Sequence, residues 1–135
     1  MPYLLHWKPH GVVKHFTGFV SGAEFVQSVV DVTGNSQFDD LQFIINDFLD
    51  ADDHGITRES LLDIVVLRLG ASLTRNGIRT IITTTAPKFE EIAHVVNADL
   101  PDGVPRTVVF PTMPIATEWL AQQPPLTSLP LRRSF

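Results

Sequence analysis

Residues 3–25, YLLHWKPHGVVKHFTGFVSGAEF, decide the fold because they lead two strand-like runs directly into the start of a helix. Ser21-Gly22-Ala23-Glu24 has the serine and the glutamate of a capping box, which satisfies free backbone amides at a helix N-terminus. We therefore predict a β-hairpin followed at once by a helix that ends near Val32. The side chains expected on the buried face of that helix are Phe25, Val26, Val29 and Val30.

The turn between the two strands predicts how they pair. Residues 8–12, KPHGV, suit a three-residue loop with proline at the first turn position and glycine at the left-handed one. This loop places His6 opposite Lys14. It also places Lys8 opposite Val12 and Leu5 opposite His15, with Leu5, Trp7 and Val13 on one face and His6, Lys8 and Lys14 on the other.

The rest of the chain alternates short apolar runs with longer amphipathic segments. Residues 41–48, LQFIINDF, are apolar enough for a strand buried on both faces. Phe89, Ile92, Ala93 and Val96 follow the spacing of one helix face. By the same criteria we predict strands at 41–48, 78–84 and 106–110, polar loops at 33–40 and 50–56, and helices at 58–73, at 87–98 and from Thr112, the last with Ile115, Trp119 and Leu120 facing inward.

The order of these elements, β-β-α-β-α-β-α-β-α, predicts an α/β fold. A hairpin followed by three βα units forms a mixed five-stranded sheet packed with about four helices. A chain of 135 residues is long enough for one domain with its own core, which we assign to residues 1–123. Prolines at 124, 125 and 130 disfavour a regular element, so we expect residues 124–135 to form an extended tail.

The composition excludes several classes of function. The chain has no cysteine, which removes disulfides, thiolate metal sites and a thiol nucleophile. Its net charge of −5 argues against binding to nucleic acids. Asp63 and Arg68 interrupt the longest apolar stretch, so we expect no membrane span. The first residues lack the pattern of a signal peptide, and we expect a cytoplasmic protein.

Two stretches of the chain resemble a known family. GVVKHFTGFVSGAEF at residues 11–25 and FDDLQFIINDFLD at residues 38–50, with a helix start near Thr57, resemble the STAS fold. More narrowly, they look like the bacterial SpoIIAA-like group, also described as STAS-SEC14-like. The resemblance implies a non-enzymatic regulatory or protein-interaction domain. SEC14-like relatives bind lipids, so it also implies an alternative, a small carrier of an apolar ligand.

The resemblance points to a candidate functional surface. Anti-sigma factor antagonists of the STAS group carry a phosphorylatable serine where the loop after the third strand meets the next helix, usually in an Asp-Ser-Ser/Thr-Gly context. The equivalent residues 56–59 here are ITRE, which lack that motif. We therefore predict that Thr57 caps the helix and is not a phosphoacceptor. The residues assigned to this surface are Asp47, Asp50, Thr57 and Ser60.

The predicted helix at residues 58–73 carries more apolar side chains than one buried face needs. Two interpretations stay open. Either the helix is buried on most sides, or it exposes an apolar surface that binds a ligand, an unknown protein partner or a second copy in a homodimer. The candidate contact residues are Leu61, Leu62, Val65, Val66 and Leu69.

The sequence contains no motif for catalysis or metal binding. It lacks Gly-x-Ser-x-Gly, Ser-x-x-Lys, a glycine-rich phosphate loop and His-Glu-x-x-His. The acidic run at residues 50–53 begins like a calcium-binding EF-hand loop, but Leu61 stands where that loop needs a glutamate. We predict no catalytic residue, no metal and no cofactor. An enzyme whose site assembles from distant residues is the third interpretation, after the interaction domain and the carrier.

Overall fold

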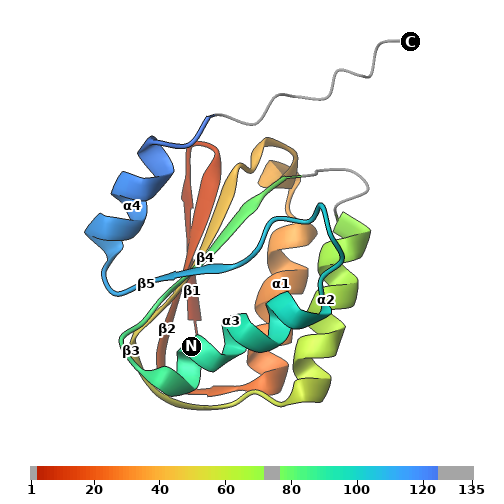
Figure 1. The fold of residues 1–135 in the computed structure, drawn as a ribbon, viewed down its shortest axis with the longest axis vertical. Coiled ribbons are helices and arrows are strands. Elements are labelled where there is room, and N and C mark those ends of the chain that lie inside the picture. The colour runs from red at the N-terminus through yellow and green to blue at the C-terminus, as the bar shows by residue number, and fades with distance from the viewer. Residues whose placement is uncertain (1–2, 72–76, 125–135) are drawn as a thin grey trace.

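The computed structural model describes residues 3–71 and 77–124, which form a five-stranded sheet with helices on both faces (Figure 1). The strands follow one another across the sheet in the order β1-β2-β3-β4-β5. β1 is antiparallel to β2, and each later pair of neighbours is parallel. The predicted α/β fold is therefore confirmed. The elements are β1 Tyr3–Lys8, β2 Gly11–Ser21, α1 Gly22–Thr33, the 3-10 helix η1 Ser36–Asp40, β3 Phe43–Gly55, α2 Arg58–Ala71, β4 Arg79–Thr83, α3 Pro87–Asp99, β5 Val108–Phe110 and α4 Met113–Ala121.

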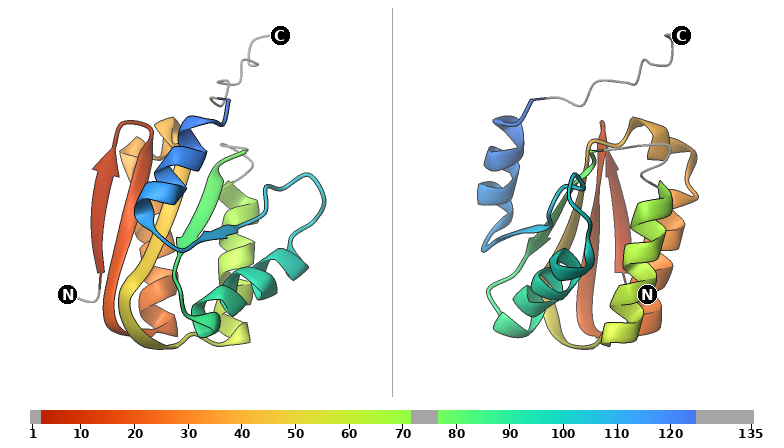
Figure 2. Two further views of the ribbon diagram at one scale, coloured as in Figure 1. Left: turned by 60° about the vertical axis from the view of Figure 1, so that its left-hand side comes forward. Right: turned by 45° about the vertical axis from the view of Figure 1, so that its right-hand side comes forward.

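The helices cover the two faces of the sheet unequally (Figure 2). α1, α2 and α3 lie on one face, and α4 lies on the other. The main core fills the space beneath α1, α2 and α3, where aromatic rings stack. The ring centroids of Phe16 and Phe48 are 4.8 Å apart, and those of Phe48 and Phe89 are 4.6 Å apart. A smaller cluster around Ile45 and Ile81 packs against α4.

The predicted register of the hairpin is wrong by one residue. Because side chains alternate between the two faces of a strand, a slip of one residue changes which cross-strand neighbours share a face. The main consequence concerns Lys14, which was expected to point outward and instead lies in the core beneath α1. The observed pairs are Lys8 with Gly11, Trp7 with Val12, His6 with Val13, Leu5 with Lys14 and Leu4 with His15.

The slip arises in the turn, which has two residues, Pro9 and His10, in place of three. His10 adopts the positive φ, 67°, that was expected for Gly11. Gly11 is favoured by close packing, because a Cβ atom there would lie 2.1 Å from the ring of Phe43. Glycine is therefore needed at position 11 because of the neighbouring Phe43 ring, and not because of the backbone conformation of the turn.

β3 is longer than predicted. Residues 50–56 were expected to form a polar loop, yet β3 continues to Gly55. The second half of β2 pairs with this segment in parallel, from Thr17 with Asp50 to Ser21 with Gly55; the register shifts just before Thr17 and once more between Gly18 and Phe19. Backbone hydrogen bonds to β2 hold the segment in the sheet whatever its side chains are. This is why an acidic sequence forms a strand here.

The helix starts agree with the prediction, and some inward faces differ. The capping box of α1 is present: Ser21 Oγ accepts from Glu24 N at 3.1 Å, and Glu24 Oε1 accepts from Ser21 N at 2.9 Å. The four residues predicted on the inner face of α3 are all buried. On α1 the inner face is formed by Phe25, Ser28, Val29 and Val32, whereas Val26 is half-buried and Val30 is exposed. On α4, Ala116 is buried and Trp119 and Leu120 are half-buried. Ile115, which was predicted to face inward, is exposed.

The burial of Ser28 explains why the inner face of α1 is rotated relative to the prediction. Its hydroxyl oxygen accepts a hydrogen bond from the buried amine of Lys14, so this polar side chain has to face inward. The expected polar loop at residues 33–40 also contains η1, which buries Phe38. Residues 72–73 of the predicted second helix and residues 125–135 of the predicted tail lie outside the described residues.

Candidate functional site

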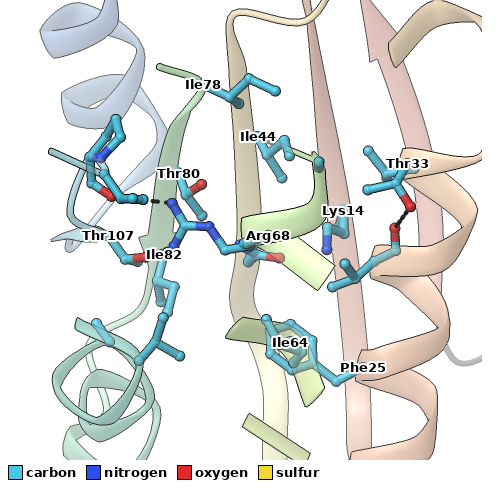
Figure 3. A pocket seen from close by; sticks show the side chains of 18 of the residues that line it. Lys14, Phe25, Thr33, Ile44, Ile64, Arg68, Ile78, Thr80, Ile82 and Thr107 are labelled. Atoms are coloured by element: carbon cyan, nitrogen blue, oxygen red, sulfur yellow. Dashed lines mark hydrogen bonds between the residues drawn. The ribbon is translucent and has the colours of Figure 1, made fainter. Parts of the chain in front are cut away.

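A cavity lies between the sheet and the three helices α1, α2 and α3 (Figure 3). Its volume is about 90 Å³, several times the roughly 10–15 Å³ that a cavity needs in order to hold one water molecule. Protein interiors are packed closely enough that voids of this size are few. Most of the wall is apolar, formed by Phe25, Val29, Ile64, Ile82, Ile92 and Val96.

One end of the cavity is closed and the other is more accessible. Phe25 and Ile64 are each 4% exposed and close the end that lies deepest in the core. Ile44 and Ile78 lie at the opposite end of the view in Figure 3, and both are only half-buried.

Lys14 is the first charged residue in the cavity wall. It lies in the middle of β2, where strand alternation aims it at the helices together with Val12 and Phe16, and it is 3% exposed. Its Nζ donates to Ser28 Oγ at 3.1 Å and lies 5.4 Å from the centroid of the Phe25 ring. Burial, and next the positive charge of Arg68, lower the pKa of Lys14 from 10.5 to about 7.

Arg68 is the second charged residue in the cavity wall. It comes from the last turn of α2, one helical turn after Ile64, so both side chains point to the same side of the helix. Its Nη1 donates to Thr107 Oγ1 at 3.1 Å and its Nη2 to Pro105 O at 3.2 Å. These bonds hold the guanidinium in the cavity wall. Burial, and next the charge of Arg106, lower the pKa of Arg68.

The two cations share the cavity without a carboxylate partner. Within residues 3–71 and 77–124, neither Lys14 nor Arg68 forms an ion pair. Asp31 on α1 is the acidic residue that raises the pKa of Lys14, but its carboxylate accepts hydrogen bonds from Tyr3 and Gln27 instead. A buried charge without a partner is costly, so this arrangement is unusual for a purely structural core.

A third polar side chain in the wall is incompletely bonded. Asn46 on β3 pairs in register with Lys14 on β2 and is 4% exposed. Its Nδ2 donates to Ile81 O at 3.3 Å, while its Oδ1 is buried and has no hydrogen-bond partner among the described residues. The polar part of the cavity therefore combines two positive charges with a free acceptor.

Asp47 and Asp50 of the predicted surface lie beside His15. His15 Nδ1 is 3.2 Å from Asp47 Oδ2, and His15 Nε2 is 3.3 Å from Asp50 Oδ2. Asp47 also accepts from Thr83 Oγ1 at 2.8 Å, and Thr83 in turn contacts Met113 of α4. Asp47 is therefore on the face that α4 covers, away from the cavity.

Thr57 and Ser60 form a separate pair at the start of α2. Thr57 Oγ1 accepts from Ser60 N at 3.1 Å and lies 3.1 Å from Ser60 Oγ. This is the cap that the sequence predicted. α2 packs on the face opposite Asp47, so the four predicted surface residues do not form one cluster.

The apolar residues of α2 divide between core and surface. Leu61 and Val65 are buried in the main core, because their spacing of four residues turns both toward the sheet. Leu69 is half-buried and packs against the same core. Leu62 is 42% exposed and Val66 is 67% exposed. Of the five residues, Leu62 and Val66 are the two that lie on the surface, and they are the ones that an exposed apolar contact surface could use.

The cavity and its charged residues were missed in the sequence. Lys14 was assigned to the outer face of the hairpin because the register was wrong. Arg68 had a usable signal, since it follows the apolar Ile64 by four residues and so lies on the inner face of α2. Among the described residues, no group of three His, Asp or Glu side chains is placed to hold a metal ion. None of the described helices combines the length and the apolar character that crossing a membrane requires.

The fold is shared with two solved structures. The anti-sigma factor antagonist SpoIIAA in its unphosphorylated form matches with a TM-score of 0.62 and 14% identity, over 90% of this chain and 99% of that one. An uncharacterized DUF3478-family protein with a SpoIIAA-like fold from Shewanella loihica PV-4 matches with a TM-score of 0.52 and 14% identity, over 87% of this chain and 91% of that one. Comparisons with models of protein families and with curated proteins gave no match. The resemblance predicted from the sequence is thus confirmed for the fold, which is SpoIIAA-like.

Proposed function

We propose that this SpoIIAA-like protein binds a small, largely apolar molecule in the cavity between its sheet and α1, α2 and α3. The observation that supports this is the cavity itself, about 90 Å³ beside a core of aliphatic side chains and stacked aromatic rings. In cores where a side chain has been truncated, the cavity left behind destabilises the protein by roughly 24 cal/mol for each Å³. A bound molecule would offset that cost.

The size of the cavity limits the ligand. A cavity of about 150 Å³ holds benzene, so this one, of about 90 Å³, accepts a molecule smaller than benzene, or the end of a longer chain. The carrier implied by the SEC14-like resemblance is the corresponding function. It ranks ahead of the interaction domain because it uses a feature of the interior that has no evident structural purpose.

Native mass spectrometry of freshly purified protein tests the proposal. We expect a small molecule that remains bound in the native spectrum and is released on denaturation. Ala93, which lines the cavity, offers a variant that fills it: Ala93→Leu should lose the ligand. Ala23→Leu, on the exposed face of α1, is the matched control and should keep it. Circular dichroism verifies that both variants fold.

A result against the proposal is equally clear. The proposal would fail if the protein carried no small molecule and if its melting temperature did not respond to a panel of small alcohols, amides and carboxylic acids. It would also fail if Ala93→Leu retained the ligand as well as the wild type.

A second candidate function is a protein-interaction domain, as the sequence resemblance implies. Leu62 and Val66 favour it, since they expose apolar surface side by side on α2. Sedimentation velocity tests this candidate. If Val66 lies in a homodimer interface, Val66→Glu should shift the protein toward the monomer, and Thr117→Glu on the exposed face of α4 should not. A wild type that stays monomeric at high concentration removes the homodimer.

A further inference from the structure

We propose that the cavity takes a short-chain carboxylate, with the carboxylate between Lys14 and Arg68 and the alkyl group against the apolar wall. This inference rests on the proposed function and adds the charge of the ligand. It follows from the presence of two cationic side chains in the wall of one small cavity, Lys14 from β2 and Arg68 from α2; in Figure 3 the guanidinium of Arg68 is turned toward Thr107.

The first argument is the cost of the two charges. Lys14 is 3% exposed, and Arg68 is half-buried and held in the wall by Thr107 and Pro105, so both cations are partly or wholly withdrawn from water. Buried charges in proteins are normally paired. Here the hydrogen-bond partners are neutral oxygens, so the positive charge of Arg68, and that of Lys14 whenever its amine is protonated, has no compensating negative charge. One bound anion would compensate both cations at once.

The second argument is that the protein supplies no such anion itself. Asp31 is the acidic group that acts on Lys14, and its two carboxylate oxygens bind Tyr3 and Gln27. Asp47 lies on the opposite face of the sheet with Thr83 and His15. Asn46 adds a buried acceptor but no charge. The positive end of the cavity is thus left for a ligand to complete.

The third argument concerns the class of anion. Apart from Lys14, Arg68, Asn46 and three threonines, the side chains of the wall are mostly apolar, which suits an alkyl group as the remainder of the ligand. After their bonds to Thr107, Pro105 and Ser28, the two side chains keep about five N–H donors, which can serve both oxygens of a carboxylate. The mostly apolar wall and the small volume, and not the number of donors, favour a carboxylate with an alkyl group over a phosphate. A volume of about 90 Å³ admits a short chain.

The charge of Lys14 also makes binding dependent on pH. Among the groups that face it, Arg68 from α2 opposes its protonation and Asp31 from α1 favours it, while Ser28, Phe25 and Asn46 do not titrate. A carboxylate beside the amine stabilises its protonated form. By linkage, the affinity for a carboxylate falls as the pH rises above about 7.

Isothermal titration of the full chain at about pH 6, where Lys14 is mostly protonated, tests the inference with acetate, butyrate and hexanoate. Each acid is paired with its uncharged amide, which has nearly the same shape. We expect at least one acid to bind about tenfold or more tightly than its amide. Lys14→Met and Arg68→Met should each remove that preference, whereas Lys8→Met, an equivalent change at an exposed position, should keep it.

The outcomes separate the inference from the proposed function. An amide that binds as well as its acid, or inorganic phosphate that binds more tightly than any of the acids, would overturn the carboxylate assignment. If none of the acids binds while the native spectrum still contains a small molecule, the inference fails and the proposed function stands. The acid and amide comparison uses the wild type, so it does not depend on whether the variants fold.

Reductive methylation gives an independent location for the site. The wild type is treated with formaldehyde and borohydride in the presence and absence of butyrate, and the modified lysines are identified by peptide mass spectrometry. We expect butyrate to reduce the methylation of Lys14 and to leave the methylation of the exposed Lys8 and Lys88 unchanged. Equal modification of Lys14 with and without a saturating carboxylate would place the ligand elsewhere and overturn the inference.

Discussion

Lys14 Nζ donates to Ser28 Oγ over 3.1 Å inside the protein and thereby joins the middle of β2 to α1. The serine hydroxyl in turn donates to Phe25 O at 2.7 Å. Burying a lysine amine beside a neutral partner costs free energy, and an aliphatic side chain would fill the same space without that desolvation cost. The predictions below follow from this pair and from the elements that place it.

The pH dependence of stability is the first prediction. The pKa of Lys14 is lowered to about 7 in the folded protein and returns to its ordinary value on unfolding. Between these values the unfolded chain binds more protons than the folded one, so the free energy of unfolding should rise with pH from about 7 to about 10. Urea denaturation across that range measures it. A wild type and a Lys14→Met variant with parallel pH profiles would contradict the prediction.

Replacing Lys14 should also stabilise the protein. Lys14→Met keeps most of the side-chain volume and removes the buried amine, so the free energy of unfolding at neutral pH should increase by at least about 1 kcal/mol. Lys8→Met, at an exposed position, should change it by less than about 0.5 kcal/mol. Chemical denaturation compares the two. A destabilised Lys14→Met would mean that the lysine contributes to folding rather than to binding.

The hairpin turn provides a test of the observed register. His10 has a φ of 67°, which a β-branched residue adopts only with strain. His10→Val should therefore lower the free energy of unfolding by roughly 1 kcal/mol. His10→Gly should leave the free energy of unfolding unchanged or raise it slightly. Thermal unfolding measures both variants. If His10→Val is as stable as His10→Gly, the positive φ lies at another residue of the turn.

The cap of α2 gives a further prediction. Thr57 Oγ1 accepts the backbone hydrogen bond of Ser60, so Thr57→Ala should cost about 1 kcal/mol and Thr57→Asp should be tolerated. Thr85→Ala, at another exposed threonine, is the control. Denaturant titration gives the values. Stoichiometric phosphate on Thr57 or Ser60 in protein isolated from its own cells would assign the pair a regulatory role instead.

Local patterns predicted the fold well. The capping box at Ser21 and Glu24 and the stripe from Phe89 to Val96 depend on residues close in sequence, and the structure contains both. The extension of β3 to Gly55 depends on pairing with β2, more than thirty residues away, so its acidic sequence looked like a loop. Long-range pairing of this kind leaves no local signal.

The site was harder to predict because it depends on one residue of register. Whether Lys14 faces solvent or core follows from a two-residue turn at Pro9 and His10, and a proline–glycine pattern fitted a three-residue loop equally well. Arg68 could have been placed inward from its spacing to Ile64. That the two cations meet in a cavity depends on how α2 packs on the sheet, which no single segment encodes.

The pKa of the Lys14 amine, measured by NMR with ¹³C-labelled lysine, tests the central claim most directly. We expect a value of about 7 in the free protein, a rise on addition of a saturating carboxylate such as butyrate, and no change with butyramide. Lys8 in the same spectra serves as the internal reference. A free Lys14 that titrates near 10.4 like an exposed lysine, or one that responds equally to the acid and the amide, would contradict the proposal that this cavity holds an anion.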